Sequence, residues 1–113
     1  MKKLIFLLML VFVLSFLYAG QSYNAYISTA PTTIYSARSQ VDLFVVANSS
    51  VTAQWVDIGD GSTTTLKMTI YCPASNTIIV PIPGYIKFDT SVIATTLNDD
   101  WNNKKVKLII NIK

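Results

Sequence analysis

Six aspartates are the residues that could do acid–base or metal chemistry in this chain, because its 113 residues include no histidine and no glutamate. Without histidine, neither a Ser-His-Asp nor a Cys-His arrangement can form, and the usual zinc ligand sets are incomplete. General acid–base catalysis would need two aspartates side by side, and Asp42, Asp57 and Asp60 are the closest candidates. Each is explained more simply as a strand or turn residue, so we expect no catalytic residue and no enzyme activity.

The segment DIGDG at residues 57–61 resembles a fragment of a calcium-binding loop. It lacks the remaining oxygen ligands and the terminal glutamate of the standard loop, and Asp-Gly between two strand-like runs is typical of a hairpin turn. Asp99 and Asp100 could hold a cation together with Asp89, but an exposed acidic loop explains them as well. The sequence therefore predicts no metal site and no cofactor.

Two aromatic residues are candidates for binding rather than catalysis. Trp101 stands among Asn and Asp residues, where its ring could stack on a sugar or fold inward and close the end of the domain. Tyr85 is the second candidate for contact with a glycan or another protein. Trp55 and the single cysteine, Cys72, are expected in the core, Cys72 as a small apolar side chain without a nearby cation to make it reactive.

The chain begins with a hydrophobic leader. Residues 4–19 are apolar except for Ser15, and Lys2 and Lys3 precede them, which is the layout of a secretory signal peptide. The run is slightly shorter than the ~20 residues that span a membrane. Residues 1–20 are therefore either a cleaved signal peptide or a retained hydrophobic helix that anchors the protein to a membrane. Both alternatives predict an exported protein.

The net charge of +3 comes largely from this leader. Past residue 20, seven basic side chains face six aspartates, and the only basic cluster is Lys104, Lys105 and Lys107, close to Asp99 and Asp100. Proteins that bind nucleic acid usually carry a basic stripe on one face. We therefore do not expect nucleic acid as a partner.

Beyond the leader, apolar and polar side chains alternate with the period of two that is typical of β-strands. Residues 40–48 and 51–58 are predicted to form a central hairpin. The turn between them, Asn48-Ser49-Ser50, also matches the N-glycosylation acceptor pattern. The side chains predicted to face inward are Val41, Leu43, Val45 and Ala47 on the first strand and Val51, Ala53 and Trp55 on the second.

Further short strands follow the same pattern, separated by turn residues. They are predicted at 23–28, 32–36, 63–72, 77–82, 85–88, 91–97 and 105–112. Pro81 and Pro83 restrict their strand to a sheet edge or a bend. About eight strands without a helical segment predict an all-β fold, an antiparallel β-sandwich of the jelly-roll or Ig-like type that forms one domain over residues 21–113.

A series of short motifs covers residues 33–113. The motifs are Ile34-Tyr35, VDLFVVANSS (41–50), VTAQWVDI (51–58), PIP (81–83), YIKFD (85–89), SVIATT (91–96) and VKLIINI (106–112). Their order resembles that of small β-sandwich structural proteins of tailed bacteriophages, which decorate capsids or associate with tails. The resemblance implies a non-enzymatic assembly protein of a virion, whose partners are copies of itself or a larger shell or tail protein.

Three hypotheses for function follow. In the first, a virion-associated structural protein makes contacts through an apolar outer face at Phe44, Val46 and Ile109, which are costly to leave exposed together. In the second, a secreted or surface-anchored bacterial binding module recognises a glycan or a protein through Trp101 and Tyr85. In the third, residues 4–19 stay in a membrane and anchor the domain at the periplasmic or outer surface.

Overall fold

The computed structural model describes residues 21–97 and 104–113. In these ranges the chain forms eight β-strands in two antiparallel sheets of four, and no helix. The all-β prediction is therefore confirmed. The hydrophobic helix expected within residues 1–20 lies outside the described residues, so the structure gives it no support. Over the two described ranges, the chain has no helix with the length and apolar character that a membrane crossing requires.

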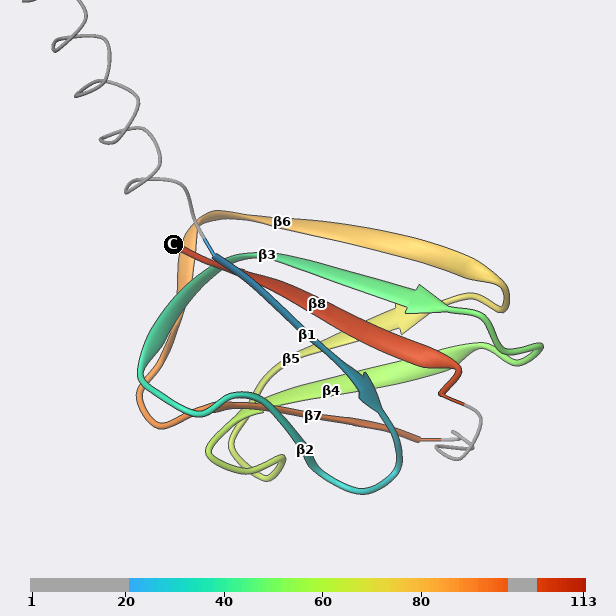
Figure 1. Cartoon of the computed structure of the whole chain (residues 1–113), viewed down its shortest axis with the longest axis horizontal. Helices are drawn as coiled ribbons and strands as arrows, with labels where there is room; N and C mark the ends of the chain where they lie inside the picture. The colour runs from blue at the N-terminus through green and yellow to red at the C-terminus, as the bar shows by residue number, and fades with distance from the viewer. Residues whose placement is uncertain (1–20, 98–103) are drawn as a thin grey trace, which may run out of the picture.

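The two sheets lie face to face, and Figure 1 shows one above the other. Sheet A consists, in spatial order, of β1 (Gln21–Ile27), β8 (Val106–Ile112), β3 (Ser39–Asn48) and β6 (Asn76–Phe88). Sheet B consists of β2 (Thr32–Tyr35), β7 (Val92–Thr96), β4 (Gln54–Asp60) and β5 (Leu66–Cys72). Of the eight strands, only β4 and β5 are both consecutive along the chain and members of one sheet, so most connections cross between sheets.

The core lies between the sheets and is built from alternate residues of each strand. At its centre the rings of Phe44 and Phe88 pack edge to face, with 6.4 Å between their centroids, in the geometry that aromatic pairs prefer. The other fully enclosed apolar side chains include Ile27, Val41, Val46, Val56, Ile58, Val92, Val106, Leu108 and Ile110.

The structure corrects the inward face predicted for β3. Phe44 and Val46, which we expected on the outer face, are 0% exposed. The cause is a β-bulge, because the pairing of β3 with both of its neighbours shifts register between Val41 and Leu43. The extra residue, Asp42, moves every later side chain of the strand to the opposite face of the sheet.

The predicted central hairpin is also wrong. Its two strands are β3 and β4, which lie in different sheets, and residues 49–53 carry the chain from one sheet to the other. Val51, predicted to be buried, is 91% exposed in this connection. The strand pattern of residues 41–47 and 54–58 is correct, but a local pattern cannot tell a hairpin from a crossing between two layers.

The inward face of β4 is the second correction. Gln54, Val56 and Ile58 are buried, so Trp55, predicted in the core, lies on the outer face of sheet B. Apolar residues stand at both odd- and even-numbered positions of this segment. An inward face with Ala53 and Trp55 therefore fits the sequence as well as the face with Val56 and Ile58 that the structure uses.

Asn48 fixes the point at which the chain leaves sheet A. Its buried side-chain Nδ2 donates hydrogen bonds to the carbonyl oxygens of Thr52 (2.9 Å), Cys72 (3.3 Å) and Pro73 (3.2 Å). Its Oδ1 accepts hydrogen bonds from the backbone N–H (3.0 Å) and the hydroxyl (2.7 Å) of Ser50. One amide thus ties the end of β3 to the crossing segment and to the end of β5.

Because Asn48 is buried, the Asn-Ser-Ser acceptor pattern for N-glycosylation is inaccessible in the folded protein.

The strands predicted at 77–82 and 85–88 are a single strand, β6, at one edge of sheet A, as the two prolines indicated. Residues 82–85 face the bulge in β3, where pairing passes from Val41 opposite Ile86 to Leu43 opposite Pro81. Gly84 adopts a φ of +77° there, a conformation that residues with a Cβ rarely adopt. Glycine at this position lets β6 pass the bulge and continue to pair.

Two neighbouring valines of β3 test the bulge. Val46→Ala should lower the free energy of unfolding by about 2 kcal/mol, because it removes two fully buried methyl groups and leaves a cavity. Val45→Ala, on the outer face, should lower it by less than about 1 kcal/mol. Urea unfolding of both variants measures the difference. A larger loss for Val45→Ala would contradict the register.

A second pair of variants tests the crossing. Asn48→Ala should cost about 2–3 kcal/mol of unfolding free energy, because it leaves several buried carbonyl groups without a donor. Asn48→Asp should cost at least as much, since it directs carboxylate oxygens at those carbonyls. Asn24→Ala, at an exposed position of β1, is the control and should change stability by no more than about 0.5 kcal/mol. An Asn48→Asp variant as stable as the wild type would contradict this role.

Candidate interaction surface

The outer face of sheet A carries a continuous group of apolar side chains, which we call the apolar band. Val45 on β3 lies opposite Ile79 on β6 and, on its other side, opposite Ile109 on β8. In the next row Leu43 lies opposite Pro81. Directly opposed side chains on one face of a sheet touch, so these five residues form one patch. Ile79 is exposed over 66% of its surface.

The bulge in β3 creates this band. It directs Leu43 and Val45 outward and sends Phe44 and Val46 inward. The apolar character of the whole segment 43–47 is the signal in the sequence, since a strand that is apolar on both faces is usually covered on both faces. The sequence therefore predicted an apolar outer face on this sheet, but of the residues that form it the prediction named only Ile109.

Polar and charged residues border the band on the β1 side. Tyr26 on β1 lies opposite Lys107 on β8, whose ammonium is 5.5 Å from the centre of the tyrosine ring. Lys104 approaches the same ring to 5.9 Å. These distances allow cation–π attraction, which holds two positive charges at this corner. The border is therefore positively charged and aromatic.

A second polar border lies near the bulge. The side-chain Nδ2 of Asn111 donates a 2.8 Å hydrogen bond to Asp42, the bulge residue. Beside it, the Lys113 ammonium is 5.4 Å from the ring centre of Tyr85. An apolar centre with a polar border is the usual anatomy of a protein–protein interface.

The five residues predicted to make contacts lie in different parts of the protein. Ile109 lies in the apolar band, as expected. Phe44 and Val46 are core residues, because the bulge reverses their direction. Tyr85 is 45% exposed on β6 and contacts Lys113. Trp101 lies outside the described residues.

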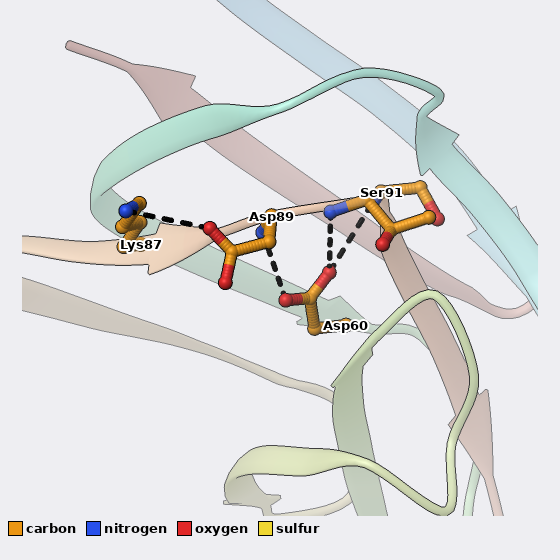
Figure 2. A network of polar contacts seen from close by, with 5 residues as sticks. Asp60, Lys87, Asp89 and Ser91 are labelled. Atoms are coloured by element: carbon orange, nitrogen blue, oxygen red, sulfur yellow. Dashed lines mark hydrogen bonds and ion pairs between the residues drawn. The ribbon is translucent and has the colours of Figure 1, made fainter.

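Asp60, a candidate for acid–base or calcium chemistry in the sequence, instead joins two turns. It is the last residue of β4, and Figure 2 shows its carboxylate against the turn between β6 and β7. There it accepts backbone N–H groups from Asp89 (2.8 Å), Thr90 (2.8 Å) and Ser91 (3.3 Å). Lys87 and Asp89 form an exposed ion pair of 3.4 Å in the same view.

This contact sets the charge state of Asp60. The hydrogen bond from the backbone of Asp89 lowers the pKa of the Asp60 carboxyl below its ordinary value of 3.8. Partial desolvation opposes this effect, while the N–H groups of Thr90 and Ser91 and the charge of Lys67 add to it. The carboxylate is therefore ionised at neutral pH and anchors the turn.

The three aspartates considered for catalysis do not come together. Asp42 accepts its bond from Asn111 outside sheet A, Asp57 accepts a 2.7 Å bond from the Thr69 hydroxyl outside sheet B, and Asp60 holds its turn. Across residues 21–97 and 104–113, no three His, Cys, Asp or Glu side chains gather where they could hold a metal ion.

Cys72 is a buried free cysteine at the end of β5, as the sequence suggested. Its thiol donates to the backbone carbonyl of Asn76 at 3.3 Å. Burial raises the pKa of the Cys72 thiol, and a thiol in that state is a poor nucleophile. The residue therefore belongs to the core and not to a site.

The Asp60 contact can be tested by mutation and by pH. Asp60→Ala should lower the free energy of unfolding at pH 7 by about 1–2 kcal/mol, because it removes charge-assisted hydrogen bonds that solvent partly screens. Because the folded pKa is depressed, this contribution is complete above the ordinary pKa and is lost as pH falls through the folded pKa. The difference in stability between the wild type and Asp60→Asn should therefore shrink below about pH 4.

Urea unfolding at a series of pH values measures this difference. Lys87→Ala is the matched control, because it breaks only the exposed ion pair and should change stability by less than about 0.5 kcal/mol. A stability gap between wild type and Asp60→Asn that widens on acidification would have the wrong sign and would refute the assignment.

The chain was compared with known proteins at three levels. No protein-family model matches it, no curated protein matches it, and no solved structure matches it.

Proposed function

We propose that this protein is a non-enzymatic structural or assembly protein of a virion, which acts through protein–protein contacts. Its partners would be copies of itself or a larger shell or tail protein. The observation that carries the proposal is the apolar band on the outer face of sheet A. Contiguous exposed apolar residues within a polar border are typical of protein interaction sites.

The edge of sheet A favours contact through the face. β6 is an edge strand, and Pro81 and Pro83 lie along it. Proline has no N–H to donate, so these residues hinder the addition of a further strand at this edge. A partner that covers the apolar band without pairing to β6 would bury Ile79, Val45 and Ile109 together. Burial of apolar surface contributes about 25 cal/mol per Å².

The strand order supports the assignment of the β-sandwich to the jelly-roll type. The arrangement β1-β8-β3-β6 against β2-β7-β4-β5 matches that expected of an eight-stranded jelly roll. Jelly rolls occur in viral capsid proteins and also in lectins. Because a fold hosts many functions, this order is compatible with both the virion hypothesis and a secreted binding module.

The proposed location rests on the leader. A protein with residues 4–19 as a signal or an anchor would be exported, and would act at a cell surface or on a virion displayed at a membrane. Residues 21–113 would then form the single working domain. The alternative function, a secreted or surface-anchored bacterial module for a glycan or a protein, is favoured by an aromatic pair on sheet B that is described below.

Self-association tests the primary proposal. The full chain in mild detergent should form oligomers in sedimentation velocity experiments, and Ile79→Asp should raise the concentration at half-association by about tenfold or more. Leu66→Asp, an exposed leucine on sheet B, is the matched control and should associate like the wild type. The wild type and both variants carry the same leader, so a difference in their self-association comes from the substituted residue and, for Ile79→Asp, from the apolar band.

A wild-type chain that remains monomeric, with no change in Ile79→Asp, would refute self-assembly through sheet A. Equal loss of association in Ile79→Asp and Leu66→Asp would also count against it, because the effect would not be specific to the apolar band.

A further inference from the structure

A pair of aromatic side chains lies on the outer face of sheet B. Trp55 on β4 is directly opposite Tyr71 on β5, and their ring centroids are 4.7 Å apart with an interplanar angle of 52°. The two residues are 46% and 47% exposed, respectively. We call them the aromatic pair. Their outward faces are open although each ring supports the other, so the pair is held in place without being buried.

A polar row lies beside the aromatic pair. Asp57 follows Trp55 by two residues on the same face of β4, about 6.6 Å further along the strand. It is flanked by Thr69 on β5 and Thr95 on β7. The Thr69 hydroxyl donates to Oδ1 of Asp57 at 2.7 Å, which orients the carboxylate. Among the described residues, Oδ2 of Asp57 accepts no hydrogen bond and remains available to a ligand.

This composition differs from that of the apolar band. A partner protein would be expected to meet an apolar centre, but three of the five side chains on this surface carry a carboxylate or a hydroxyl. A nucleic acid or another phosphate would be repelled by Asp57. Lys67, the next outward residue on β5, lies beyond Thr69, away from the aromatic pair and toward Asp60. The surface therefore suits a ligand that is neutral, flat on one side and rich in hydroxyl donors.

We propose that the outer face of sheet B binds a neutral saccharide. The C–H face of a pyranose ring stacks on the aromatic pair, and its edge hydroxyls donate to the free oxygen of Asp57. Thr69 positions the carboxylate, and Thr95 supplies a further hydroxyl on the other side of Asp57. Of the two candidates in the sequence, Tyr85 lies on β6 of sheet A and therefore does not take part in this site.

This site is independent of the assembly role, because the outer faces of sheets A and B are on opposite sides of the sandwich (Figure 1). A copy whose apolar band is covered by a neighbour would still present Trp55 and Asp57 to solvent. The two activities can therefore coexist in one particle or surface layer, and either proposal can fail without the other.

A glycan array probed with the full chain tests the proposal. The array carries neutral glucans, mannans and galactans, with sialylated and sulfated glycans as charged counterparts. We expect binding to at least one neutral glycan and weaker binding to its charged counterparts. Isothermal titration with that glycan should then show affinity reduced about tenfold or more by Trp55→Ala. Tyr71→Ala and Asp57→Asn should also weaken binding, and Trp55→Phe should retain part of it.

Tyr85→Ala is the matched control, because Tyr85 is exposed to nearly the same extent as Tyr71 but lies on sheet A. It should bind the glycan like the wild type, and circular dichroism should show every variant folded. If Trp55→Ala does not fold, Tyr71→Ala and Asp57→Asn decide the question. Absence of binding to every glycan, preference for anionic glycans, or binding that survives both Tyr71→Ala and Asp57→Asn would overturn the proposal.

Discussion

A single extra residue in β3, an inner strand of sheet A, decides what each face of that sheet presents. Asp42 interrupts the pairing of β3 with both of its neighbours, and a shift of one residue reverses the direction of every side chain beyond it. Phe44 therefore reaches the core and packs against Phe88, while Val45 is directed to solvent. The core and the apolar band are two results of the same bulge.

The connections between the sheets depend on polar side chains. The chain has a single cysteine, so no disulfide within it can join the sheets. Asn48 instead ties the end of β3 to the end of β5, and Asp60 ties the end of β4 to the turn that leads out of β6. Each side chain satisfies several backbone groups at a point where the chain changes sheet and the regular ladder ends. The cross-sheet connections are thereby specified by hydrogen bonds as well as by burial.

The two outer faces have different chemistry, which fits the proposal that they bind different partners. Sheet A offers the apolar band, centred on Val45, to the proposed protein partner. Sheet B offers Trp55, Tyr71 and Asp57 to the proposed saccharide. Since the faces are on opposite sides of one sandwich, a single small domain could be attached to an assembly by one face and meet its surroundings with the other.

The alternating pattern in the sequence determined the strands, the all-β class and the outward position of Ile109, because a period of two is a local property. It predicted the wrong side for Val46 and for Trp55, because apolar residues stand at both odd- and even-numbered positions there. Only the tertiary structure settled this, through the bulge at Asp42 and the crossing at Asn48. Both depend on partners far away in the chain, which a local pattern does not contain.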